Sequence, residues 1–152
     1  MVSVLAAVTA VHLLFGALWA GGVVFVVWRV LPLVSAGELS VDPARRIASG
    51  TQWLTRASAV VMLLTGGHMA ATLYDTASLT GTGRGHVVVT MTVLWLAMTG
   101  LVEAGFSRYT DALDSNKIRT AGRESRTLLR AAGAVGVVLL VLGGWLAATG
   151  GA

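Results

Sequence analysis

Four long stretches of the chain contain no acidic or basic residue. They cover residues 1–28, 57–74, 85–102 and 131–152 and are rich in Val, Leu, Ala and Gly. A helix needs about 17–25 apolar residues to cross the core of a bilayer, and each stretch is of that order. The pattern predicts an all-α integral membrane four-helix bundle in a single domain, residues 1–152, with helices at about 2–31, 43–74, 84–109 and 123–149.

Proline and polar residues refine the expected helix boundaries. Pro32 is expected to end the first helix, because proline lacks the amide that continues a helix. Asp42 followed by Pro43 is typical of a helix start, with the acid as N-cap and proline in the first turn. The other links are expected to be irregular, with a Thr-, Ser- and Gly-rich segment at 75–83 and a polar cytoplasmic stretch at 110–122.

The basic residues gather beside two of the expected links. Ten of the eleven flank or lie in these two segments, namely Arg29, Arg45, Arg46, Arg56, Arg108, Lys117, Arg119, Arg123, Arg126 and Arg130. Short loops rich in Lys and Arg stay in the cytoplasm. We therefore expect a multi-pass protein of the cell (plasma) membrane with both termini outside and its polar loops inside. This topology accounts for the net charge of +4, so the expected partner is the lipid bilayer and not nucleic acid.

Two further features narrow the chemistry. The chain has no cysteine, which excludes disulfides, iron–sulfur clusters and covalently attached haem. The first apolar stretch has no basic leader and is longer than a signal peptide core of about 7–15 residues, so we expect it to be retained as a helix. Glu103 is expected to form an ion pair with Arg29 near the cytoplasmic interface.

The three histidines lie in or beside the expected spans. At about 1.5 Å per residue, His12 would lie roughly 15 Å below the outer end of its helix and His68 roughly 9 Å below the end of the second. His86 would lie within about one turn of the outer end of the third helix. All three are therefore expected in the outer half of the membrane, where an ionisable residue is a candidate functional site.

Each histidine shares a helical face with small or polar residues, and polar faces in lipid turn toward partner helices. The three faces consist of Thr9, His12, Gly16 and Trp19; of Ser58, Thr65, His68, Thr72 and Asp75; and of His86, Thr90, Ala97, Gly100 and Ala104. The pattern predicts one polar pocket near the outer surface that contains all three imidazoles.

Imidazole is the commonest metal ligand in proteins, and two imidazoles from facing helices can hold the iron of haem b. Gly16 and the Gly66-Gly67 pair would leave room for the flat macrocycle, with Trp19 beside it. The thioethers of Met69 and Met91 would instead favour Cu(I). In the simplest alternative, each histidine bonds a threonine or a backbone carbonyl and only packs helices together.

The segment His12-Leu-Leu-Phe-Gly-Ala-Leu-Trp19-Ala-Gly-Gly22, which runs on to Leu31-Pro32, resembles the first helix of the CopD-type (copper-resistance D) membrane family. That family is related to the HemJ-type protoporphyrinogen oxidases. The resemblance continues with Arg45-Arg46 before the second helix and Thr65-Gly66 late in it. It implies a four-helix module; HemJ-type members bind haem b, and CopD-type members are linked to copper uptake.

Carried over by position, His12 matches the first-helix histidine of these proteins. His86 falls where HemJ-type proteins have a histidine followed closely by lysine, but the third helix here contains no lysine. Protoporphyrinogen oxidase activity is therefore not expected. His68, which follows the Thr-Gly signal, is the alternative second ligand.

Three functional hypotheses follow from the sequence. The leading one is a bis-histidine haem b site near the outer leaflet, formed by His12 with His68 or His86, in an electron-transfer protein or membrane oxidoreductase. Its partner would be quinol or an extracytoplasmic redox protein. The second is a copper transport or copper-handling protein that uses the same histidines with Met69 or Met91. The third is a non-catalytic helical subunit, and both a homo-oligomer and a subunit of a larger membrane complex fit the sequence.

Overall fold

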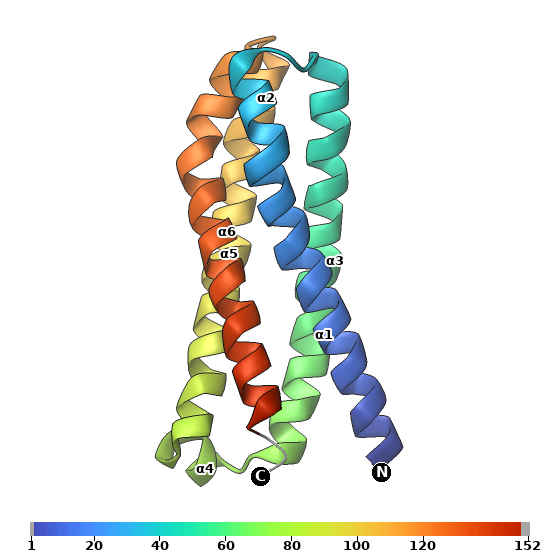
Figure 1. Ribbon diagram of the computed structural model, residues 1–152, viewed down its shortest axis with the longest axis vertical. Helices are drawn as coiled ribbons and strands as arrows, with labels where there is room; N and C mark the ends of the chain where they lie inside the picture. Colours follow the sequence, from blue (N-terminus) through green and yellow to red (C-terminus); the bar gives the residue numbers. More distant parts are fainter. Residues whose placement is uncertain (1, 150–152) are drawn as a thin grey trace.

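The computed structural model describes residues 2–149, and over this range every regular element is helical (Figure 1). The long helical segments 2–36, α3, α5 and α6 run side by side, and residues 2 and 149 lie at the same end of the bundle. The elements in chain order are α1 (Val2–Phe25), the π-helical turn η1 (Val26–Val30), α2 (Leu31–Ala36), α3 (Val41–Leu73), α4 (Thr76–Gly81), α5 (Gly83–Asp114) and α6 (Ile118–Ala148). The predicted all-α fold is confirmed for the described residues.

Three helical segments are long and apolar enough to cross a membrane. They are Val4–Ala36, Gly83–Asp114 and Ile118–Ala148. The remaining long helix, α3, has 33 residues but is less apolar, because Arg45, Arg46 and Arg56 lie in its first half. Three of the four predicted spans therefore have the length and composition of a membrane crossing, as expected of a multi-pass membrane protein.

The first helix does not end at Pro32, and the sequence prediction was wrong on this point. The chain widens into the π-helical turn η1 just before the proline, which then sits in the first turn of α2. Proline is tolerated there, because the first amides of a helix have no carbonyl partner within it. The helix ends instead at Gly37, whose φ of 76° is the left-handed conformation that glycine adopts without strain.

The links are shorter and more helical than predicted. The third and fourth spans extend into the expected polar stretch until only residues 115–117 separate them, and the outer link contains α4. The reason is that the polar stretch contains Ala112, Leu113 and Ala121, whose side chains are buried against neighbouring helices. Likewise, α3 begins at Val41 with Ser40 as N-cap, slightly before the expected Asp42.

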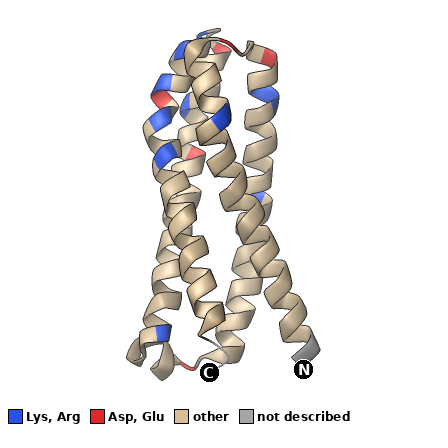
Figure 2. Cartoon of the chain, in the orientation of Figure 1, with Lys and Arg blue, Asp and Glu red and all other residues tan. Residues whose placement is uncertain are grey.

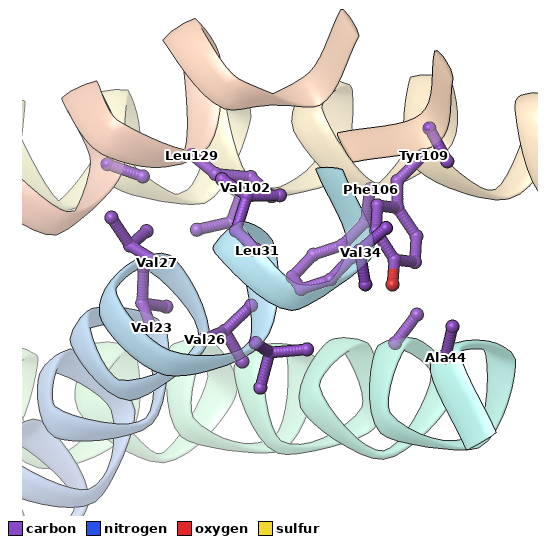
Figure 3. Close-up of a cluster of buried hydrophobic side chains, with 14 of the residues drawn as sticks. Val23, Val26, Val27, Leu31, Val34, Ala44, Val102, Phe106, Tyr109 and Leu129 are labelled. Carbon is purple, nitrogen blue, oxygen red and sulfur yellow. The ribbon is translucent and has the colours of Figure 1, made fainter. Parts of the chain in front are cut away.

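Most of the buried side chains lie in the half of the bundle that contains the links at residues 37–40 and 115–117, beside which the basic residues gather. Figure 3 shows part of this cluster, to which α1 and α2 contribute Val23, Leu31 and Val34, α5 contributes Phe106 and α6 contributes Leu129. The opposite half carries almost no charge (Figure 2). In that half and at the bundle centre, glycines of α6 pack against side chains of α1 and α5.

Candidate metal site

His12 of α1 faces Thr65 of α3 across the seam between these helices. Its Nδ1 lies 2.8 Å from the Thr65 Oγ1, and that hydroxyl lies 2.6 Å from the carbonyl oxygen of Val61. Because the hydroxyl proton is donated to the Val61 carbonyl, the Thr65 oxygen accepts a hydrogen bond from Nδ1–H of His12. This bonding pattern assigns the proton of a neutral ring to Nδ1, and the Nε2 lone pair then has no recorded partner within residues 2–149.

Gly66 makes room for the imidazole. A Cβ atom at this position would lie 3.0 Å from Cε1 of His12, so the ring packs directly against the backbone of α3. Thr65 thus accepts the hydrogen bond of the ring, and Gly66, which has no side chain, leaves space for the ring. The sequence singled out this Thr-Gly pair, and the structure shows what it does locally.

Two methionines of α3 flank the His12 ring, one turn away on either side. The sulfur of Met69 lies 3.9 Å from the Thr9 hydroxyl, one turn before His12 on α1. Met62 packs on Gly16, one turn after His12, where an added Cβ would lie 3.6 Å from the Met62 sulfur. Met69 was expected from the sequence as a ligand and Met62 was not, although the spacing places Met62, Thr65 and Met69 on one helical face.

His68 and His86 lie in other surroundings. Both side chains are exposed, and Nε2 of His86 donates a hydrogen bond to the Thr80 carbonyl oxygen at 2.7 Å. Within residues 2–149 no group of three or more His, Asp or Glu side chains is arranged to hold a metal ion. The structure therefore joins His12 to Thr65 and Gly66, and it does not gather the three histidines into one such group.

The other residues expected to line a haem pocket, Gly16, Gly67 and Trp19, also lie in different surroundings. Gly16 is covered by Met62, whereas Gly67 has no side chain or other atom within 4 Å of an added Cβ and faces open space. Trp19 is buried, with 2% of its surface exposed, and its indole Nε1 has no hydrogen-bond partner among residues 2–149. The haem b site remains a prediction.

Buried hydroxyls without partners continue along α3 below Met62. Thr55 and Ser58 are fully buried, and the structure records no hydrogen bond for either hydroxyl. Thr65 and Thr72 of the same helix each donate to the carbonyl four residues earlier, which is the usual solution for a hydroxyl within a helix. The two unpaired hydroxyls therefore stand out, because a buried polar atom without a partner normally costs about 1–3 kcal/mol.

Glu103 is held by an ion pair between α3 and α5. Two guanidinium nitrogens of Arg56 lie 2.9 and 2.8 Å from the two carboxylate oxygens of Glu103. The expected pair with Arg29 was wrong, since α5 places Glu103 beside α3. A second ion pair, between Arg45 and Asp114, joins the same two helices closer to their basic ends. Both pairs lie in the half of the bundle away from His12.

A comparison with protein-family models matches residues 46–146 to the family described as copper resistance protein D. No curated protein and no solved structure matches the chain. The matched range covers most of α3, α4, α5 and nearly all of α6, about two thirds of the chain, while His12 lies before it. The predicted family is thereby confirmed: the chain belongs to the copper resistance protein D family of membrane proteins.

Proposed function

We propose that this protein binds copper inside its helical bundle and passes it through the membrane, with the His12 imidazole as a ligand. The observation that carries the proposal is how the His12 ring is held, by a hydrogen bond to Thr65 and by packing on Gly66. Thr65 holds the ring in the Nδ1–H form, so that Nε2 is available, and Met62 and Met69 lie one turn to either side. Membership of the copper resistance family agrees with this chemistry.

The ligand types favour copper over other metals. Thioethers are soft ligands that select Cu(I), and imidazole also suits copper. Magnesium, calcium and manganese prefer carboxylate, carbonyl and water oxygens. The α1–α3 seam offers the His12 nitrogen and, about one turn to either side of it, one methionine sulfur. A hydrogen-bonded outer partner such as Thr65 is the usual companion of a histidine ligand, because it fixes the tautomer and the ring orientation.

The proposed orientation places the site in the outer half of the membrane. We infer that α3 is a fourth crossing, because it joins the end of the first span to the beginning of α5 at the opposite end of the bundle (Figure 1). The end that carries ten of the eleven basic residues is assigned to the cytoplasm. Both termini are then outside, and His12 lies between the outer surface and the bundle centre.

Haem b is not part of this proposal. A bis-histidine site needs a second imidazole facing His12, whereas the side chains of His68 and His86 are exposed, and His86 is engaged with a backbone carbonyl. Gly16, expected to leave space for the macrocycle, is covered by Met62. These contacts favour the copper hypothesis, and the bis-histidine haem b site stays the alternative prediction.

The test is a Cu(I) titration of the purified full chain in mild detergent under anaerobic conditions, with a chromophoric chelator as competitor. The variant His12→Gln removes the proposed ligand, and His86→Gln is the matched control. We expect the wild type and His86→Gln to bind Cu(I) equally. We expect the affinity of His12→Gln to be lower by about a hundredfold or more, because loss of a direct ligand should cost at least as much as loss of its hydrogen-bond partner.

Two results would overturn the proposal. One is equal Cu(I) affinity of the wild type and His12→Gln. The other is a purified wild-type protein with a haem absorption band that disappears in His12→Gln, which would support the electron-transfer hypothesis instead.

A further inference from the structure

The four methionines outside the N-terminal residue form two pairs with identical spacing. Met62 and Met69 are seven residues apart on α3, and Met91 and Met98 are seven residues apart on α5. Seven residues are close to two full turns, so the two members of each pair lie on one face of their helix, about 10 Å apart along its axis.

The two ion pairs between α3 and α5 give the register of these antiparallel helices. From Arg56 to Arg45 the chain moves eleven residues along α3, and from Glu103 to Asp114 it moves eleven residues along α5. The register is therefore constant over this segment.

Continued in the other direction, the same register places Met62 level with the residue before Met98, and Met69 level with the residue before Met91. Each methionine of α3 thus has a methionine of α5 at its own height in the bundle.

The other two helices repeat the same spacing. On α1, Met62 packs on Gly16 and Met69 contacts Thr9, again seven residues apart. On α6, an added Cβ at Gly136 would lie 3.4 Å from the sulfur of Met98, and an added Cβ at Gly143 would lie 3.6 Å from Cε of Met91. The added Cβ at Gly136 would also lie 3.2 Å from the Cβ of Ala20, one turn beyond Gly16 on α1, so Gly136 and Gly16 are offset by about one turn. The methionines therefore lie against small residues of the neighbouring helices.

The bundle thus contains two layers of the same composition. We call them the outer sulfur layer (Thr9, Met69, Met91, Gly143) and the inner sulfur layer (Gly16, Met62, Met98, Gly136). Each takes a small residue from α1, a methionine from α3, a methionine from α5 and a glycine from α6. His12 lies on α1 between the two layers, three residues from Thr9 and four from Gly16.

We infer that the two sulfur layers are successive Cu(I) stations, and that His12 passes the ion from the outer to the inner layer. The inference rests on the proposed copper function and deepens it, since it assigns the oxidation state and the route. Thioethers are neutral and soft, so they stabilise a monovalent copper ion in lipid without a buried carboxylate. The ion stays Cu(I) throughout, and no electron or proton is transferred.

The route continues beyond the inner sulfur layer. One turn from Met62 on α3 lies Ser58, followed by Thr55, and both are fully buried hydroxyls without a hydrogen-bond partner. The register between α1 and α3 places the unpaired Trp19 indole near the level of Ser58, because Thr9 faces Met69 and Gly16 faces Met62. These hydroxyls and the indole extend the line of buried polar atoms beyond the inner sulfur layer, and such atoms can bind water or an ion.

Packing alone does not account for this arrangement. Methionine often fills irregular gaps in a core. Here, however, the register of the two ion pairs, continued along both helices, places a methionine of α3 within one residue of the height of a methionine of α5, twice. The two layers flank the histidine whose Nε2 has no recorded hydrogen bond within residues 2–149. Leucine would fill the same space with little cost, because leucine and methionine are nearly equal in volume.

The experiment measures Cu(I) uptake into liposomes that contain the full chain, with a Cu(I) chelating dye inside. The variants are Met62→Leu/Met98→Leu for the inner layer and Met69→Leu/Met91→Leu for the outer layer. Leu54→Met, which changes the contact with Gly22 on the same α1–α3 seam outside both layers, is the matched control. We expect each double variant to slow uptake by about tenfold or more, the effect of a barrier higher by about 1.4 kcal/mol, and the control to match the wild type.

The outcomes separate the two proposals. If the wild type and both double variants take up Cu(I) equally, the sulfur layers are packing only and the inference fails, whereas the copper function stands. If the wild type takes up no Cu(I), the proposed function itself fails. If a double variant does not fold, the single variants replace it. A second measurement needs no variant, because it tests whether Ag(I) or Zn(II) competes with Cu(I) uptake by the wild type. Uptake that Ag(I) inhibits and excess Zn(II) does not inhibit supports the sulfur route, and inhibition by Zn(II) contradicts it.

Discussion

The hydrogen bond between His12 and Thr65 gives the most specific prediction. Thr65→Val keeps the shape of the side chain but removes the oxygen that accepts the Nδ1–H bond. A donor left without a partner away from water costs about 1–3 kcal/mol, and the ring is then free to change its tautomer or turn away. Loss of such an outer partner typically weakens metal affinity about 10- to 100-fold, or about 1.4–2.7 kcal/mol.

The assay is the anaerobic Cu(I) competition titration, with two controls. Thr65→Ser keeps the hydroxyl and should bind Cu(I) as the wild type does. Thr72→Val removes a hydroxyl of the same helix whose recorded bond is to the His68 carbonyl, and it should also leave the affinity unchanged. Equal affinity of Thr65→Val and Thr72→Val, or an equal loss in Thr65→Ser, would refute the argument that Thr65 sets the tautomer of His12.

Two further predictions concern the bundle itself. Gly122→Ala should lower the thermal unfolding midpoint in detergent by several degrees, because the new Cβ would lie 2.8 Å from the Ser35 amide nitrogen; such overpacking costs about 1–3 kcal/mol. Gly50→Ala, with nothing within 4 Å of the added Cβ, should not lower it, and equal midpoints would contradict the packing argument. Glu103→Gln should destabilise the protein more than the double variant Arg56→Gln/Glu103→Gln, because the single change leaves the guanidinium without its carboxylate. A double-mutant cycle of the same unfolding midpoints measures the difference, and a double variant less stable than Glu103→Gln would contradict it.

The membrane-spanning helices were predictable because their signal is local. A stretch without charged residues that is long enough to cross a bilayer identifies a span whatever the rest of the chain does. The ends of the helices depended on longer-range packing. Pro32 falls inside a continuous helix because the π-helical turn before it absorbs the irregularity, and Leu113 extends α5 because it is buried against neighbours.

The candidate site was only partly predictable. The polar helical face that residue spacing predicts is wider than the strip of α3 that contacts α1. Thr65 and His68 are three residues apart and, at about 100° per residue, point about 60° away from each other. In the narrow seam with α1, that rotation is enough for Thr65 to meet His12 while His68 is exposed. Met62 and Met69 differ by only about 20° and share the seam, but their partners on α5 became apparent only once the two ion pairs fixed the register.

X-ray absorption spectroscopy at the copper edge, on the Cu(I)-loaded full chain, tests the central claim most directly. We expect a mixed first coordination shell with one imidazole nitrogen and at least one thioether sulfur. The nitrogen should disappear in His12→Gln, and the sulfur should decrease when Met62 and Met69 are both replaced by leucine. A shell of nitrogen and oxygen alone, or a spectrum that His12→Gln leaves unchanged, would show that copper does not bind where the seam between α1 and α3 offers it ligands.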